Sequence, residues 1–323
     1  MKKLRIVTLI AAVMACIFAL AGCGGSQQSS SSASNSAKKN LQPITIGVMP
    51  DTDSVPFLIA QEKGYFADEG LDVEIKPFKS AMDRDSALQS GNLDGAVSDM
   101  LAAAFAKSGG FDVKITSATD GSYKLIAGKG ENVKAVADLQ GKDVAVSRNT
   151  IIEYVADQIL MKNNMTGESV NKVVIPQIPT RLEMLQNGKL AAATLPEPMA
   201  SIAVYNGCQY VTGSDELGIN PGVMVFTDKA VKDKAESIRA MYRAYNRAVK
   251  YLNETDRSEY IDFVVEKSGF PPVAKEALKM PQYHEAFLPA ESDLAGCMDW
   301  LTGKQLITKG YSYKDIVVTD LIK

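Results

Sequence analysis

Four clusters of carboxylate, hydroxyl, amide and guanidinium side chains directly follow short apolar segments, and such clusters can bind a small polar solute. The residues concerned are Asp51, Asp53, Ser54, Ser98, Asp99, Arg148, Asn149, Thr150 and Glu197. Ligands of open α/β sheets bind beyond the carboxyl ends of the strands. Because two clusters come from each half of the chain, we expect all four to meet in one cleft if the halves face each other.

The charges of these clusters leave the sign of the solute open. The four carboxylates of the set stand against the single guanidinium of Arg148, which favours a solute with amino or cationic character. Thr150 precedes a predicted helix, however, and the free N–H groups of a helix N-terminus suit a carboxylate, sulfonate, phosphate or nitrate. Tyr123 and Tyr154 are candidate aromatic walls for a planar solute, or else half-buried packing residues.

Helix capping is a second explanation for several of these residues. Residues 150–153 and 180–183 have the spacing of capping boxes. Ser54 and Asp99 suit N-cap positions. Capping and solute binding are compatible, because a cap residue lies beside free backbone N–H groups.

The sequence offers little catalytic machinery. Its only histidine, His284, lies in the C-terminal region, where we expect a surface or packing role. The sequence has no metal-site spacing of Cys and His, and no GxGxxG, P-loop or GxSxG motif. We therefore expect no enzymatic activity, no cofactor and no bound metal. Two alternatives are an enzyme with Asp99 or Glu197 as general base and a lipoprotein that binds another protein.

Apolar periodicity places the clusters in two successive α/β segments. Strand-like and helix-length runs alternate from residue 44 to 117, and the pattern restarts at residue 123, which predicts mainly parallel sheets covered by helices on both faces. The expected strands span residues 44–49, 71–75, 93–97, 113–117, 123–127, 143–147, 172–175, 191–195, 209–211 and 223–227. The expected helices span residues 55–63, 81–89, 100–107, 151–162, 181–186, 197–205, 229–253, 258–267, 272–280 and 292–307.

A repeated hexapeptide indicates that the two segments are similar. LQSGNL at residues 88–93 recurs as LQNGKL at residues 185–190. Gly91 and Gly188 fit the position after a helix, where the backbone turns left-handed. Each copy leads into a short strand and then a polar turn that opens a helix.

The N-terminus has the features of a cleaved secretory signal. Three basic residues precede an apolar run over residues 6–20, which is shorter than the roughly 20 residues of a membrane span. The segment LAGC at residues 20–23 resembles a bacterial lipobox, in which the cysteine is acylated and cleavage occurs just before it. We expect residues 1–22 to be a signal peptide, Cys23 to carry lipid such as palmitate, and residues 23–40 to be a solvated Ser-rich linker. A plain secretory signal is the alternative.

Charge and cysteine content narrow the partners. Removal of three basic residues with the signal lowers the formal net charge from −3 to −6. The sequence lacks a basic stripe with interleaved aromatic residues, so we expect no nucleic acid partner. Cys208 and Cys297 could pair outside the cytoplasm or stay as two separate buried thiols.

Four segments resemble the extracytoplasmic solute-binding proteins of ABC importers. Within them, the similarity is greatest to the nitrate, sulfonate/taurine and thiamine-precursor binding group. The segments are residues 46–75, 87–99, 139–154 and 184–198. Especially characteristic are EKGYF at residues 62–66 with EGLDV at residues 69–73, and the turn formed by Glu197 and Pro198.

The resemblance implies an α/β architecture, the type II periplasmic-binding fold, with two doubly wound lobes joined by two crossover strands. Residues 41–125 would form lobe 1, residues 126–225 lobe 2, and residues 226–323 C-terminal helices that return to lobe 1. The family's ligand-contacting turns match the four polar clusters. One departure is Arg148 with Asn149, where many relatives carry small residues or glycine.

The resemblance also implies a function. We expect a monomeric, lipid-anchored substrate-binding protein outside the cytoplasm, on the cell membrane, whose partners are a small solute and an ABC permease. The carboxylates favour a nitrogen-containing organic solute, such as a pyrimidine resembling a thiamine precursor. Nitrate, taurine or another sulfonate is the alternative.

Overall fold

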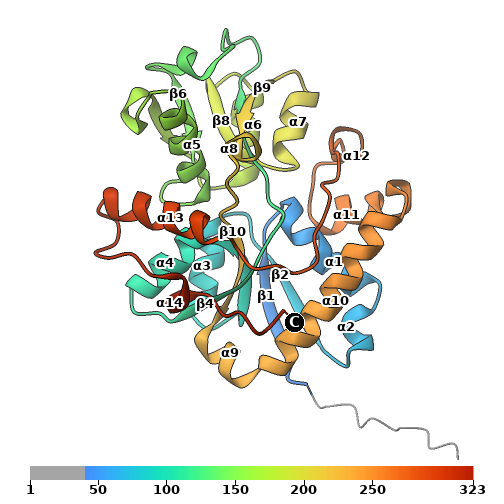
Figure 1. Ribbon diagram of the computed structural model, residues 1–323. Helices are drawn as coiled ribbons and strands as arrows, with labels where there is room; N and C mark the ends of the chain where they lie inside the picture. The colour runs from blue at the N-terminus through green and yellow to red at the C-terminus, as the bar shows by residue number, and fades with distance from the viewer. Residues whose placement is uncertain (1–40, 323) are drawn as a thin grey trace, which may run out of the picture. The chain divides into compact units, whose positions relative to one another are not determined.

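The computed structural model describes residues 41–322 (Figure 1). The predicted signal peptide, the predicted lipidation at Cys23 and the linker lie outside the described residues. Within residues 41–322, no helix combines the length and the apolar character needed to span a membrane.

The first sheet has five strands in the order β2-β1-β3-β10-β4. β1 (Ile44–Val48) is parallel to β2 (Val73–Pro77) and to β3 (Gly95–Asp99). β10 (Gly222–Thr227) is antiparallel to both β3 and β4 (Val113–Ala118). This sheet and the helices that cover it are called lobe 1 below.

The second sheet repeats this topology in the order β7-β6-β8-β5-β9. β6 (Asp143–Val146) is parallel to β7 (Asn171–Val174) and β8 (Ala192–Pro196), whereas β5 (Tyr123–Ala127) is antiparallel to β8 and β9 (Gln209–Gly213). This sheet and α5 to α8 are called lobe 2. The predicted fold class is confirmed, and the antiparallel strand of each sheet is the one that follows a crossing of the chain between the lobes.

Helices flank both sheets (Figure 1). The α-helices are α1 (Val55–Glu62), α2 (Tyr65–Asp68), α3 (Ala81–Gln89), α4 (Met100–Ser108), α5 (Ile151–Lys162), α6 (Ile178–Gln186), α7 (Met199–Tyr205), α8 (Ser214–Leu217), α9 (Asp228–Asp233), α10 (Ala235–Glu254), α11 (Ile261–Lys267), α12 (Ala274–Ala277), α13 (Glu291–Gly303) and α14 (Tyr313–Ile316). Short 3₁₀ turns lie at Thr52–Ser54, Val136–Leu139, Gly167–Ser169 and Arg257–Glu259.

Some predicted helices were wrong in extent. The helix expected over residues 229–253 is divided at Lys234, whose φ of −122° and ψ of 24° are not helical. Of the helix expected over residues 272–280, only α12 forms, because Leu278 is extended. Thr180 lies inside α6, which begins at Ile178, so residues 180–183 do not form a capping box.

The repeated hexapeptide forms the same corner in both lobes. Gly91 and Gly188 follow α3 and α6 with φ of 78° and 67°, a conformation that glycine adopts without a Cβ penalty. Leu88 and Leu185 anchor these helices in the core, with exposed fractions of 4% and 0%. Each corner leads into β3 or β8, so the predicted repeat is confirmed.

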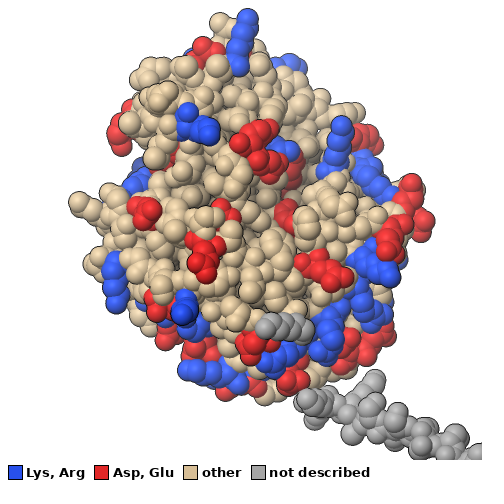
Figure 2. Space-filling model, in the orientation of Figure 1, with Lys and Arg blue, Asp and Glu red and all other residues tan. Residues whose placement is uncertain are grey.

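The C-terminal helices pack mainly on lobe 1. The ring of Tyr245 in α10 lies 4.9 Å from that of Phe57 in α1, measured between centroids, and α13 packs against α4. Acidic and basic side chains are intermingled over the face shown in Figure 2.

Candidate functional site

A pocket of about 460 Å³, counted together with the solvent at its mouth, lies between the two lobes, at the carboxyl ends of β1, β3, β6 and β8. Lobe 1 lines it with Met49, Asp51, Asp53, Ala81, Arg84, Val97, Ser98 and Asp99. Lobe 2 lines it with Tyr123, Ser147, Thr150, Ile151, Ile152, Pro176, Ile178, Arg181 and Pro196. The position is the one that parallel α/β sheets use for ligands.

Five of the nine expected site residues line this pocket. These are Asp51, Asp53, Ser98, Asp99 and Thr150. Ser54 is buried behind them, where its Oγ donates to Asp51 Oδ1 at 2.8 Å and accepts from Met49 N at 3.2 Å. Ser54 therefore shapes the turn that carries Asp51 and Asp53.

Arg148 and Asn149 are not among the lining residues. The Arg148 side chain is exposed. Asn149 has a φ of 58°, and its N–H donates to Glu153 Oε2 at 2.7 Å. The adjacent Thr150 caps α5, because its Oγ1 accepts from Ile152 N at 3.2 Å.

Glu197 lines a neighbouring groove instead of the pocket. Its Oε1 accepts from Lys124 Nζ at 2.5 Å and from Ser201 Oγ at 2.9 Å. Its backbone carbonyl accepts from Thr52 N, across the lobes, at 3.0 Å. Glu197 thus joins the lobes through its main chain while its carboxylate is paired beside the pocket.

Three aspartates form an acidic wall on lobe 1. Asp51, Asp53 and Asp99 have exposed fractions of 8%, 3% and 2%. Burial raises the pKa of Asp51 and of Asp99 to about 6. Burial and the nearby Asp51 carboxylate raise the pKa of Asp53 well above its usual range. Tyr123 of lobe 2 donates to Asp53 Oδ2 at 2.9 Å, so this wall also touches the opposite lobe.

Two buried arginines line the pocket, and sequence reasoning missed both. Arg84 in α3 donates from Nη1 to the carbonyl of Val97 at 3.2 Å. Arg181 in α6 donates from Nε to the carbonyl of Thr194 at 2.9 Å. Each arginine stands four residues before the first leucine of the repeated hexapeptide. This spacing puts the arginine and the leucine on the same face of their helix. This spacing was the available signal.

The surroundings of the two guanidinium groups differ. Arg84 Nη2 lies 2.8 Å from Asp85 Oδ1 and 3.9 Å from Asp99 Oδ2. Arg181 Nη1 donates to the carbonyl of Ile175 at 2.7 Å, and its Nη2 has no hydrogen-bond partner among the described residues. Burial lowers the pKa of Arg181 to about 10.

The lobes are close together around the pocket. Besides the bond from Tyr123 to Asp53, hydrogen bonds between the lobes run from Thr52 N to Glu197 O at 3.0 Å, from Ile178 N to Lys79 O at 3.1 Å, and from Gln177 Nε2 to Asp83 Oδ2 at 3.2 Å. Because these bonds hold the lobes together, we expect the lobes to separate when a solute enters or leaves.

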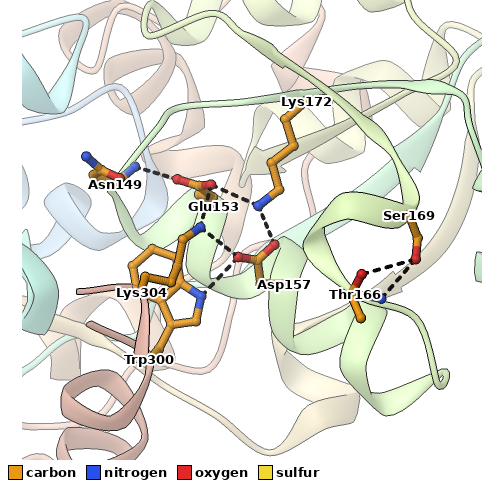
Figure 3. A network of polar contacts seen from close by, with 8 residues as sticks. All are labelled: Asn149, Glu153, Asp157, Thr166, Ser169, Lys172, Trp300 and Lys304. Carbon is orange, nitrogen blue, oxygen red and sulfur yellow. Dashed lines mark hydrogen bonds and ion pairs between the residues drawn. The ribbon is translucent and has the colours of Figure 1, made fainter. Parts of the chain in front are cut away.

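A charged network fastens α13 to α5, whose N-terminus faces the pocket (Figure 3). Lys304 Nζ lies 2.9 Å from Glu153 Oε1 and 3.2 Å from Asp157 Oδ2, and Trp300 Nε1 donates to Asp157 Oδ2 at 3.0 Å. Lys172 binds the same two carboxylates at 2.8 and 2.6 Å. The network places both acidic side chains of α5 between two lysines.

Other candidate residues lie outside the pocket. The Tyr154 ring packs edge-on against Trp300 at 5.8 Å between centroids. The His284 side chain is 64% exposed and pairs with Asp120. Cys208 and Cys297 are buried free thiols. Within residues 41–322, no group of three or more His, Cys, Asp or Glu side chains has the arrangement of a metal site.

Paired sheets of matching topology, with a pocket between their strand ends, define a type II periplasmic-binding fold. A protein-family model described as NMT1/THI5 like matches residues 51–257, more than half of the chain. The chain belongs to the NMT1/THI5-like family. The resemblance drawn from the sequence is thereby confirmed at the level of family and fold.

Curated relatives are similar over most of their length. A Brachyspira hyodysenteriae protein, whose name describes an ABC transporter periplasmic binding protein, is 24% identical over 78% of this chain and 75% of its own.

Solved structures show the same fold. The periplasmic aliphatic sulphonate binding protein of Escherichia coli has a TM-score of 0.72 at 14% identity, covering 86% of this chain and 92% of its own. The periplasmic nitrate-binding protein of Synechocystis PCC 6803 has a TM-score of 0.66 at 15% identity, covering 82% and 81%.

Proposed function

We propose that this protein is the substrate-binding protein of an ABC importer and captures a small polar solute between its lobes. The observation that carries the proposal is a pocket with ionisable side chains from both lobes, closed by hydrogen bonds between them. Binding would stabilise the closed arrangement, which a membrane permease then recognises. The Brachyspira relative's name supports this role.

The solute is proposed to be a nitrogen-containing organic molecule. Its support is the acidic wall of Asp51, Asp53 and Asp99, which suits N–H donors or a cation. A pyrimidine resembling a thiamine precursor is one example. Nitrate, taurine or another sulfonate is the alternative, favoured by Arg181 and by the names of the structural neighbours.

A capture experiment tests the role. Protein purified from membranes in mild detergent is incubated with a cell metabolite extract, washed and denatured, and released molecules are identified by mass spectrometry. We expect one small polar molecule, released unchanged. At 100 times its Kd, it should stabilise the fold by about 2.7 kcal/mol, and so raise Tm by roughly 5 °C or more. A chemically altered product would support the enzyme alternative, and no captured molecule would contradict the proposal.

We propose that Cys23 anchors the protein, as a monomer, to the outer face of the cell membrane. The support is the LAGC segment after a signal-like run, followed by a serine-rich stretch.

Cys23→Ala should therefore move the protein from the membrane fraction to the soluble fraction, or leave it as an uncleaved precursor. Fractionation and intact-mass measurement distinguish these results. Retention of processed Cys23→Ala protein in membranes would contradict the anchor.

A further inference from the structure

The two walls of the pocket carry opposite charge, and the internal repeat shows why. Arg84 and Arg181 occupy equivalent positions of the repeat, 97 residues apart. Their carbonyl partners, Val97 in β3 and Thr194 in β8, are also 97 residues apart. The carboxylates near Arg84 are Asp85 and Asp99. At the equivalent positions of lobe 2, 97 residues later, stand Leu182 and Pro196. The guanidinium of lobe 2 therefore lacks the two acidic neighbours that its counterpart has.

A structural role explains only part of Arg181. Its Nε and Nη1 satisfy two backbone carbonyls, which ties α6 to β8. Its Nη2 remains unpartnered although the side chain is 0% exposed, and no described residue forms an ion pair with it. A buried charge without a counterion is costly unless something else pairs with it.

Other features of lobe 2 favour an anion at the same place. The N-terminus of the twelve-residue helix α5 lines the pocket through Thr150, Ile151 and Ile152. The acidic residue in its first turn, Glu153, is neutralised by Lys172 and Lys304. The positive end of the helix dipole therefore adds to the field of Arg181.

The wall on lobe 1 has the opposite excess. Asp51 and Asp99 share one nearby guanidinium, that of Arg84, which Asp85 already binds. Asp53 Oδ1 has no hydrogen-bond partner among the described residues. Burial raises the pKa of all three carboxyls, and a cationic or N–H group of a solute beside them would favour their ionised form.

We propose that the solute is dipolar, with an acid group bound by Arg181 and the α5 N-terminus and an amino or other N–H group bound by Asp53 and its acidic neighbours. This rests on the proposed function and narrows its solute. Because each lobe binds one end of the solute, only a molecule with both groups can satisfy the charged groups of both lobes. It can do so only when the lobes are closed. Nitrate lacks the donor, and a pyrimidine without an acid group leaves Arg181 unpaired.

The capture experiment above also tests this proposal. The captured molecule should contain both an acid group and an N–H or ammonium group. Analogues of it that lack either group should bind wild-type protein about 10- to 100-fold more weakly by calorimetry, the range for hydrogen bonds to charged groups. A captured solute that lacks either group would overturn the proposal and leave the transport role standing. Capture of nothing would instead contradict the transport role itself.

Variants assign the two ends. Arg181→Gln and Asp53→Asn should each weaken binding of the captured molecule about 10- to 100-fold. The matched controls are Arg247→Gln and Asp68→Asn, a surface pair at 2.8 Å, which should keep wild-type affinity. Arg181→Gln should lose its preference for the solute over the analogue without the acid group. Wild-type affinity in either pocket variant would overturn the assignment, and the analogue series keeps the test valid if Arg181→Gln does not fold.

Discussion

Asp99→Asn should raise the free energy of unfolding by about 2–3 kcal/mol at pH 8. The Asp99 side chain is 2% exposed, and burial raises its pKa from 3.8 to about 6. Each unit of such a shift corresponds to about 1.4 kcal/mol between the protonation states. Asparagine is neutral and is also a good N-cap, so it can keep the bond that Asp99 Oδ1 now accepts from Ala102 N at 2.8 Å.

The gain should depend on pH in a defined direction. Below pH 4 the carboxyl is protonated in both the folded and unfolded states, and wild type and Asp99→Asn should be equally stable. Between pH 4 and 6 the unfolded state loses its proton first, so wild-type stability falls as pH rises through this window relative to the variant. Above pH 6 the difference should be constant.

Urea denaturation at pH 4, 6 and 8 measures this difference. The control is Asp112→Asn, whose exposed carboxylate pairs with Lys107 and should give no gain. An equal or lower stability of Asp99→Asn at pH 8 would mean that the charge on Asp99 is not a cost to the fold. If Asp99 also binds the donor end of the solute, the gain in stability will come with weaker binding, a common exchange at functional sites.

Glu153→Gln should lower the free energy of unfolding by about 2 kcal/mol at pH 7. Burial opposes ionisation, but the Asn149 N–H, Lys172 and Lys304 together lower the pKa of Glu153 from 4.5 to about 2. That difference alone corresponds to about 3 kcal/mol. The Lys304 side chain remains 34% exposed, and solvent screening reduces the expected effect.

The pH dependence of this second effect is opposite to that of Asp99. The stabilisation by Glu153 is complete above pH 4.5, where the unfolded-state carboxyl is already ionised. It is lost as pH falls toward 2, where the folded-state carboxyl takes up its proton. The deficit of Glu153→Gln should therefore shrink between pH 4.5 and 2.

Denaturation curves for a matched surface variant complete this test. Glu131→Gln removes a carboxylate that pairs with Lys142 at 2.9 Å, with about a third of each side chain exposed. Its cost should stay below about 1 kcal/mol. Equal costs for Glu131→Gln and Glu153→Gln would show that the network of Figure 3 adds no more than a surface pair.

Local pattern was sufficient for most elements of the fold. The predicted bounds of α3, α5 and β5 are those observed, because their apolar period and their end residues agree. Lys234 shows the limit of this reasoning. Residues 229–253 have a continuous helical pattern. The break after α9 comes from the backbone conformation of Lys234, and this segment contains no glycine or proline that would predict it.

Local sequence position also predicted part of the candidate site. Residues at or just after the end of a parallel strand lie near the ligand edge of a sheet, and Asp51, Asp53 and Asp99 reach the pocket in this way. Glu197 stands at the same kind of position, but Lys124 on the adjacent strand binds its carboxylate. That pairing depends on strand order, which the local sequence does not contain.

By itself, the sequence determined the alternation of strands and helices, the repeated glycine corner and the acidic strand ends, because these depend on neighbours along the chain. Only the tertiary structure decided that β5 and β10 insert antiparallel into the sheets. It also decided that two arginine side chains, one from α3 and one from α6, line the pocket. The reason is physical: the charge balance between the two walls depends on which side chains meet across the fold, and residues far apart in the chain make those contacts.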